Sequence, residues 1–164
     1  MNYELSIITM YITNIAFEKI KAFEGCKLQA YEDAAGVWTI GYGHTYGVRP
    51  GDKISQQYAD MLLQEDIENV ERQLIALNDP LVGDWSKSQM DAVVCLVFNI
   101  GIRRWQSSTL RRCIMLRKSE KKIRAEWMRW VHAGGKTLPG LVKRRQWETN
   151  RFFEEGCEWS KNYE

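Results

Sequence analysis

FEGCKLQAYEDAAGVWTIGYGHT, residues 23–45, is the stretch that decides the fold. Aromatic and β-branched residues on either side of a turn signal predict two short strands, at residues 28–31 and 37–42. The four residues between them, DAAG at 33–36, include the glycine that a tight turn favours. We therefore expect a β-hairpin in this part of the chain.

The second strand of this hairpin has an unusual face. Because side chains alternate between the two sides of a strand, Thr39, Gly41 and Gly43 share one side. A face that bears a hydroxyl and two bare glycines lets a ligand approach the backbone closely. The alternative is that the hairpin lies at the edge of a sheet and that these glycines simply weaken it. The first interpretation predicts that this face belongs to a binding site.

A helix is expected immediately before the hairpin. Apolar residues recur at spacings of three and four between Ile12 and Phe23, which is typical of an amphipathic helix. Gly25 is a natural end because glycine tolerates positive φ, so Glu24 would be the last helical residue. The C-terminus of a helix carries partial negative charge and disfavours a carboxylate there. This position therefore favours the protonated form of Glu24, which is the form that a general acid needs.

Length and composition indicate a globular protein. The chain has 164 residues, 45% of them apolar and 27% charged, which fits one domain or two small lobes that share a core. Residues 6–17, SIITMYITNIAF, form the most apolar segment near the N-terminus, but they fall short of the about 20 residues of a membrane span. They also lack the basic flank and cleavage site of a signal peptide. We expect a buried N-terminal helix and no stable membrane insertion.

Cysteine and histidine usage argues against disulfides and metals. The four cysteines, none of them in a CxxC pair, are Cys26, Cys95, Cys113 and Cys157. Because no export signal is recognised, we expect free thiols. The two histidines, His44 and His132, have no cluster of further ligands around them in the sequence, so we expect no metal site.

Helices are expected in the rest of the chain. Ser55 is a typical N-cap, and the apolar stripe after it predicts a long helix to about Leu77. The next helix, capped by Ser86 or Ser88, contains MDAVVCLVFNI at residues 90–100. This segment is apolar nearly all round, so it should be the central buried helix.

The C-terminal part is expected to contain shorter helices. We predict a polar turn at residues 106–109, helices at 110–117, 120–132 and 141–153, and a glycine-rich loop before the last. Tryptophans at helical spacing should fill the core of this part, and they are Trp127, Trp130 and Trp147. A small sheet among many helices predicts an α+β protein that is mainly α.

The net charge of +2 hides an asymmetry between two parts of the chain. Between Arg103 and Arg151 there are 15 Lys and Arg but only three acids, whereas the rest carries 8 basic and 18 acidic residues. A basic half indicates an anionic partner such as nucleic acid, an acidic polymer or a membrane surface. The alternative is a set of solvated helix faces, and composition leaves both open.

The first hairpin and the helix before it carry groups that glycoside hydrolysis could use. That reaction needs one carboxyl group to protonate the leaving oxygen and another to activate water or attack the sugar. Glu24 at a helix end and Asp33 in a turn could face each other across a cleft, with Thr39 holding a water. Glu32 is a rival to Asp33, but neighbours on a strand point to opposite sides. A separation of about 6.5–9.5 Å predicts inversion, and one of about 5–5.5 Å predicts retention.

The spacing Glu24-x8-Asp33-x5-Thr39, embedded in FEG…Y-x-D…G-x-x-TIGYGHT, resembles the catalytic segment of the phage-type lysozymes, the endolysins of glycoside hydrolase family 24. Later stretches resemble the interlobe helix, the central helix with its following turn, and the closing segment of that family. They are ISQQYADMLLQEDIENVERQL, SKSQMDAVVCLVFNIG with SSTLRRCI, and WVHAGGKTLPGLVKRRQWETNRF. The likeness runs from about Ile20 to about Phe153.

The resemblance implies one lysozyme-like domain over residues 1–164, with two lobes. The small β lobe would occupy about 24–54, and the interlobe helix about 55–77. The helical lobe would comprise about 78–164 together with the N-terminal helix. It implies no cofactor and no metal.

The resemblance also implies residue roles. Glu24 would be the general acid, Asp33 the base or electrostatic stabiliser, and Thr39 the residue that positions water. Two further residues would line the cleft and contact sugar, and three would support the site. The sugar contacts would be Phe98 and Thr109; His44 would brace the hairpin, and Arg144 or Arg145 would lie near Glu24 and hold it in place.

The function implied is that of a muramidase which cleaves the β-1,4 bond between N-acetylmuramic acid and N-acetylglucosamine in peptidoglycan, with inversion as the expected outcome. As an endolysin the chain would be a monomer that stays in the host cytoplasm until a holin-type pore gives it access to the wall, and it would bind no nucleic acid. Two alternatives stay open. One is a non-enzymatic module whose basic face binds nucleic acid or another polyanion, and the other is the same chemistry in a secreted antibacterial toxin.

Overall fold

The computed structural model describes residues 11–79 and 82–154. The helices in these ranges are α1 (Asn14–Glu24), α2 (Gln56–Ala76), α3 (Lys87–Ile100), α4 (Ile102–Ser107), α5 (Thr109–Met115), α6 (Glu120–Trp127) and α7 (Pro139–Phe152), with a 3₁₀ turn η1 (Val82–Asp84). The strands form two antiparallel pairs, β1 (Lys27–Glu32) with β2 (Trp38–Gly41) and β3 (His132–Ala133) with β4 (Lys136–Thr137). The predicted class, α+β and mainly α, is confirmed.

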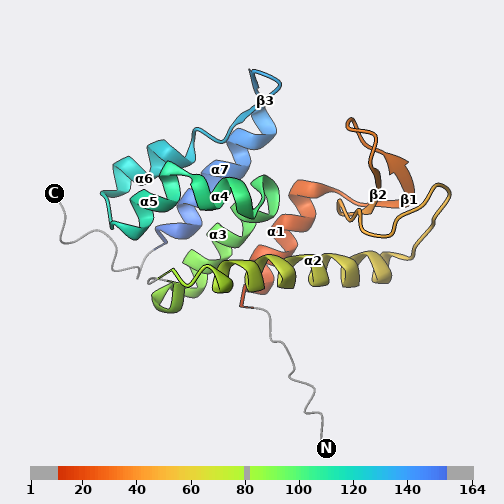
Figure 1. The fold of residues 1–164 in the computed structure, drawn as a ribbon, viewed down its shortest axis with the longest axis horizontal. Helices are drawn as coiled ribbons and strands as arrows, with labels where there is room; N and C mark the ends of the chain where they lie inside the picture. The colour runs from red at the N-terminus through yellow and green to blue at the C-terminus, as the bar shows by residue number, and fades with distance from the viewer. Residues whose placement is uncertain (1–10, 80–81, 155–164) are drawn as a thin grey trace, which may run out of the picture.

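The elements are spread along α2. Figure 1 shows the β1–β2 hairpin near one end of α2 and the group of helices α3 to α7 near its other end, with α1 between them. Residues 52–54 extend the hairpin, because the N–H of Ala30 donates to Asp52 O and that of Ile54 donates to Leu28 O, both at 2.9 Å. The division into lobes at residues 24–54, 55–77 and 78–164 stays a prediction.

The core is built around α3. Every residue from Gln89 to Val97 in this helix is buried, which confirms the predicted central helix. It packs chiefly against α7, and the fully buried rings of Trp105, Trp127 and Phe152 fill the space beside it. The packing of the helical part therefore depends on one helix that is apolar nearly all round.

Serine side chains start four of the helices. Ser55 accepts from the N–H of Tyr58 at the start of α2, as predicted. Of the two candidates for α3, Ser86 is the N-cap, and it forms a capping box with Gln89. Ser108 and Ser119 cap α5 and α6 in the same way. Each cap satisfies a backbone donor that the first turn leaves without a helical partner.

One N-terminal prediction, the start of the first helix, needs correction, and part of another lies outside the described residues. The first helix begins at Asn14 rather than at Ile12, because Thr13 is its N-cap. The N–H and hydroxyl of Thr13 both donate to the Asp91 carboxylate at 2.7 Å, which holds it outside the helix. Residues 6–10 of the predicted buried helix lie outside the described residues. Among the residues that are described, none of the helices has the length and apolar character that crossing a membrane requires.

The C-terminal part differs from prediction in three places. The polar turn expected at residues 106–109 is wrong, since α4 extends to Ser107 and α5 starts at Thr109. The helix expected to reach His132 ends at Trp127, and His132 lies in β3. Gly134 and Gly135 have φ of 57° and 75°, and two successive positive φ values make the tight turn that pairs β3 with β4. The expected loop is therefore a short hairpin.

Three of the four cysteines can be assessed. Cys26, Cys95 and Cys113 are free thiols, as predicted, and Cys157 lies outside the described residues. Burial raises the pKa of the Cys95 thiol well above its ordinary value, so this sulfur is not a reactive thiolate.

Candidate active site

The hairpin turn holds Asp33 through backbone contacts. Its Oδ1 accepts from the N–H groups of Ala35 at 2.8 Å and Val37 at 2.9 Å, and its own N–H donates to Val37 O at 3.0 Å. Gly36, at φ 79°, completes the turn by donating to Asp33 O at 3.0 Å. One carboxylate oxygen of Asp33 is thus committed to the turn, which leaves the other for chemistry.

Thr39 lies opposite Tyr31 in the hairpin and is only 4% exposed. Its hydroxyl donates to Val37 O at 3.0 Å, so the oxygen lone pairs remain able to accept. The prediction of a ligand face is wrong at Gly41, the next residue on the same side of the strand as Thr39. A Cβ on Gly41 would lie 3.6 Å from side-chain atoms of Ala59 and Ile54, which means that packing and not a ligand covers this glycine.

Glu24 is the last residue of α1, as predicted, and Gly25 ends the helix with φ 67°. The Glu24 side chain is 22% exposed. Arg144 of α7 donates from Nη1 to Glu24 Oε1 at 2.5 Å. The carboxyl group is therefore fixed by a residue 120 positions away while it keeps access to solvent.

Arg144 is itself held by buried groups. Its Nη2 donates to Cys95 O at 2.9 Å, and its Nε lies 3.3 Å from Glu148 Oε1. Burial alone would lower the pKa of Arg144, but the neighbouring Cys95, Glu24 and Glu148 outweigh this effect and the pKa is raised. This guanidinium is a permanent cation beside Glu24.

Arg145 has a different role from Arg144. It is 0% exposed, and its Nη2 donates to Asn99 Oδ1 at 2.6 Å, while its Nε lies 3.2 Å from Glu148 Oε2. Burial lowers the pKa of Arg145. Glu148 also accepts from Trp127 Nε1 at 2.7 Å. Of the two arginines that the resemblance left open, Arg144 contacts Glu24 and Arg145 contacts Asn99.

A cavity of about 420 Å³ brings some of the predicted site residues together. Glu24, His44 and Phe98 all line it. Among the described residues, Asp33 and Thr39 do not line this cavity, and Thr109 lines a separate one beside Trp130. The cavity thus joins the end of α1 to the loop after β2 and to the end of α3.

Sequence reasoning did not single out several residues of this cavity. They are Tyr42, Thr45, Tyr46, Asp66, Asn69, Val70 and Asn99, whereas Gly43, which also lines the cavity, was predicted on the ligand face of the hairpin. Asn99 follows Phe98 in the FNIG stretch, so its position in that motif was a usable signal. Asp66 and Asn69 are single polar residues of an ordinary amphipathic helix, α2, and nothing in their spacing marks them.

His44 links the hairpin to α2. Its Nδ1 lies 2.9 Å from Asp66 Oδ2, and its Nε2 lies 3.0 Å from Tyr46 O. The backbone groups of His44 and Ile40 also exchange two hydrogen bonds of 2.9 Å. These contacts join the loop after β2 to α2, and the bracing role of His44 stays a prediction.

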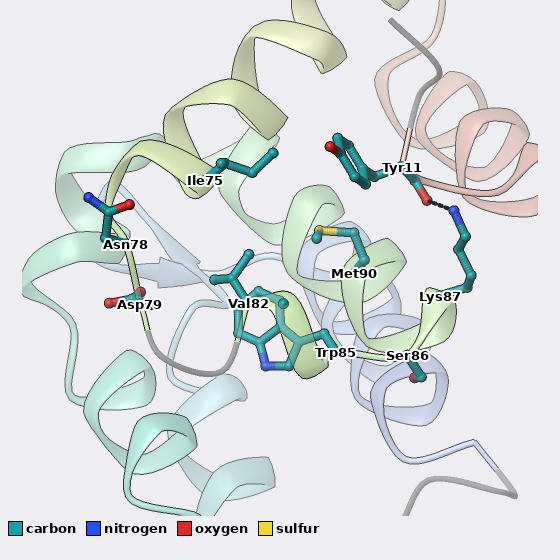
Figure 2. Close-up of a pocket in the computed structure, with 10 residues that line it drawn as sticks. Tyr11, Ile75, Asn78, Asp79, Val82, Trp85, Ser86, Lys87 and Met90 are labelled. Atoms are coloured by element: carbon teal, nitrogen blue, oxygen red, sulfur yellow. Dashed lines mark hydrogen bonds between the residues drawn. The ribbon is translucent and has the colours of Figure 1, made fainter.

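A second cavity, of about 520 Å³, contains none of the predicted site residues. Figure 2 shows it between the end of α2, η1 and the start of α3, with Trp85, Met90 and Ile75 on its walls. Lys87 Nζ donates to Tyr11 O at 3.1 Å at its edge. Its lining is mostly apolar, so the smaller cavity beside Glu24 is the better candidate for acid–base chemistry. Over residues 11–79 and 82–154, no group of three or more His, Cys, Asp and Glu could hold a metal ion.

Comparison with known proteins finds similar sequences. A family model described as phage lysozyme matches residues 21–148. The chain is 40% identical over 147 residues to the endolysin of Acyrthosiphon pisum secondary endosymbiont phage 1. This alignment covers 87% of this chain and 98% of that protein.

Solved structures are similar as well. The muramidase domain of SpmX from Asticaccaulis excentricus is 31% identical, with a TM-score of 0.76, over 87% of this chain and 97% of that one. An endolysin from Escherichia coli O157:H7 phage FAHEc1 is 32% identical, with a TM-score of 0.72, over 87% and 93%.

Proposed function

Because this chain belongs to the phage lysozyme family, we propose that it is an endolysin which hydrolyses the β-1,4 bond between N-acetylmuramic acid and N-acetylglucosamine of peptidoglycan. The observation that carries the proposal is the position of Glu24, which is fixed by Arg144 in a cavity that it shares with Phe98. A carboxyl group that is immobilised but still solvent-accessible suits proton transfer to a bound substrate.

In this proposal Glu24 is the general acid. Arg144 occupies Oε1, so the transferred proton would be carried by Oε2. Asp33 keeps one oxygen that the turn does not use, and Thr39 keeps lone pairs that can accept from water. Asp33 would act as base or electrostatic stabiliser and Thr39 would position the water, with inversion as the expected outcome and no cofactor.

The other proposed features concern the protein's surroundings. Phe98 and Thr109 would contact sugar from two separate cavities. The chain would act as a monomer, remain in the host cytoplasm until lysis, and reach the wall through a holin-type pore. The excess of basic residues between Arg103 and Arg151 would then suit a negatively charged wall. We do not expect it to bind nucleic acid.

The clearing of purified peptidoglycan by Glu24→Gln tests the central role. We expect the rate to fall by about 10²–10⁴-fold, the usual contribution of a general acid. Glu18→Gln is the matched control, because Glu18 is an exposed carboxylate on the same helix, and within the described ranges its one ion pair is with Lys21 at 3.6 Å. Near-wild-type clearing by Glu24→Gln would remove this residue from the mechanism.

Analysis of the released saccharides tests the reaction itself. Muramic acid at the new reducing ends, as the inverted anomer at early times, is expected. If intact murein released no saccharide while the protein bound DNA with a strong salt dependence, the polyanion-binding alternative would replace the proposal.

A further inference from the structure

We propose that Asn99 binds the substrate through its side-chain NH₂ group, which buried Arg145 turns toward the cavity, and that the NH₂ donates to an amide carbonyl oxygen of the glycan. The inference rests on the proposed function and adds a residue that the reaction was not expected to use. Asn99 would be a substrate-binding residue, and Arg145 a positioning residue that acts through it.

The orientation of Asn99 follows from the chemistry of its partner. Arg145 Nη2 donates to Asn99 Oδ1 at 2.6 Å. Arginine has five N–H donors and no acceptor, so only the amide oxygen can face it. The Nδ2 of Asn99 must then point away from Arg145. Because Asn99 is exposed and lines the cavity together with Glu24 and Phe98, that direction leads to the site.

The burial of Arg145 needs an explanation that packing does not provide. The side chain is 0% exposed, and among the described residues its Nε and Nη1 have no hydrogen-bond partner, although Nε lies near Glu148. Burying a charge with incomplete hydrogen bonding is unfavourable, and replacing a buried ion pair by apolar groups is often neutral or stabilising. The contact that Arg145 completes is the one to Asn99, whose amide it fixes.

A fixed donor selects an acceptor. Since the Asn99 oxygen is occupied by Arg145, the side chain presents only N–H groups to the cavity. On the sugars themselves peptidoglycan carries amide carbonyl oxygens of two kinds, one on the N-acetyl groups and one where the lactyl group of muramic acid joins the peptide. Both provide the same chemistry, so the experiment must separate them.

Asn99→Asp is the sharpest variant. Aspartate keeps an oxygen toward Arg145 and strengthens that contact, but it replaces the outward donor by a second acceptor. We expect an unchanged or higher melting temperature, a KM for soluble murein fragments that rises roughly tenfold from one lost hydrogen bond, and a smaller change in kcat. Arg145→Met, which frees the amide to rotate, should raise KM less, by roughly two- to threefold.

The added negative charge needs its own control. Asn69→Asp introduces the same charge into the same cavity without touching Arg145. If both Asp variants shift the pH–rate profile alike, the added negative charge causes that shift. If both variants raise KM equally, the proposal is overturned.

Modified substrates identify the carbonyl. N-deacetylated murein lacks the N-acetyl oxygens, whereas glycan strands stripped of peptide carry a lactyl carboxylate in place of the lactyl amide. The KM ratio of Asn99→Asp to wild type should fall toward one on deacetylated murein if an N-acetyl oxygen is bound, and should rise on stripped strands, where two carboxylates would meet, if the lactyl oxygen is bound. A ratio that is unchanged on both substrates would overturn the donor role.

The two levels of proposal fail differently. If the wild-type chain releases no saccharide, the proposed function fails and this inference with it. If the wild type is active but Asn99→Asp has the wild-type KM, only the assignment of Asn99 fails.

Discussion

The β1–β2 hairpin and the helical network of Glu24, Arg144, Arg145 and Glu148 both supply proposed site residues, but they hold them by different means. Asp33 and Thr39 bond to backbone groups at most four residues away. The helical network joins side chains up to 120 residues apart and is mostly buried. A substitution in the hairpin should therefore change activity with little loss of stability, whereas a substitution in the helical network should change both activity and stability.

The largest expected effect concerns the charge in the hairpin. Asp33→Asn keeps Oδ1 as the acceptor for Ala35 and Val37, so the turn should survive while the negative charge is lost. We expect murein clearing to slow by about 10²–10⁴-fold and the melting temperature to change by only a few degrees. The measurements are turbidity and thermal unfolding, with exposed Glu32→Gln as the control. A large loss of stability in Asp33→Asn would break the comparison.

The matching test in the helical network is Glu148→Leu. This change leaves the guanidinium groups of Arg144 and Arg145 buried without their shared partner, and we expect unfolding to become easier by about 3–5 kcal/mol in urea titrations. Glu120→Leu is the control, because Glu120 and Arg124 form an equivalent i,i+4 pair at the surface. That pair should be worth only about 0.3–0.5 kcal/mol. Similar losses for both variants would show that burial of the network contributes nothing special.

A smaller effect tests Gly41, an inward position where the hairpin packs against other elements. Gly41 has φ 62°, and a Cβ there would meet Ala59 and Ile54 at ordinary contact distance. Gly41→Ala should therefore lose about 1–2 kcal/mol through the left-handed backbone alone. Gly83→Ala, at a glycine without positive φ and with open space around it, should be nearly neutral. Equal unfolding midpoints for the two variants would contradict this account.

The smallest expected effect is a pH dependence of stability caused by Glu71. This carboxylate is buried like that of Glu148, but within residues 11–79 and 82–154 it forms no ion pair with an arginine such as Arg144 and Arg145 form with Glu148. Glu71 is 2% exposed; its Oε1 accepts from Ile12 N–H at 2.8 Å, and its Oε2 has no hydrogen-bond partner in the described part of the chain. Burial raises the pKa of Glu71 above its ordinary value of 4.5.

A raised folded-state pKa stabilises the fold below the unfolded pKa, and that contribution is lost as the pH rises through the folded value. Stability relative to Glu71→Gln, which does not titrate, should therefore fall for the wild type as pH rises through the raised value. Urea titrations of both proteins at several pH values measure this difference. A difference that moves the other way would mean that the ionised form is the one favoured by folding.

Much of the architecture could be predicted because it depends on local signals. The end of α1 at Glu24, the turn at Asp33 and the cap at Ser55 each follow from a glycine or a polar side chain within a few residues. The β3–β4 hairpin could also have been found from its two glycines. It was missed because the helical pattern before it was extended too far.

The site could be predicted only in part. The motif gives Glu24 and Phe98, which the fold does bring to one cavity. It could not choose between Arg144 and Arg145, since adjacent residues on a helix point in different directions and only packing against α3 settles which reaches Glu24. Asp66 and Asn69 were not foreseen because their importance depends on what lies across the cavity.

The sequence by itself determined the end of α1, the first hairpin turn and the cap of α2, and which residues could carry acid–base chemistry, because those properties depend on neighbours along the chain. The tertiary structure alone decided that Arg144 contacts Glu24, that Gly41 packs under α2, and that the Asn99 oxygen faces Arg145. These contacts join residues that are far apart in the chain, and their distances and burial are set only when the helices pack.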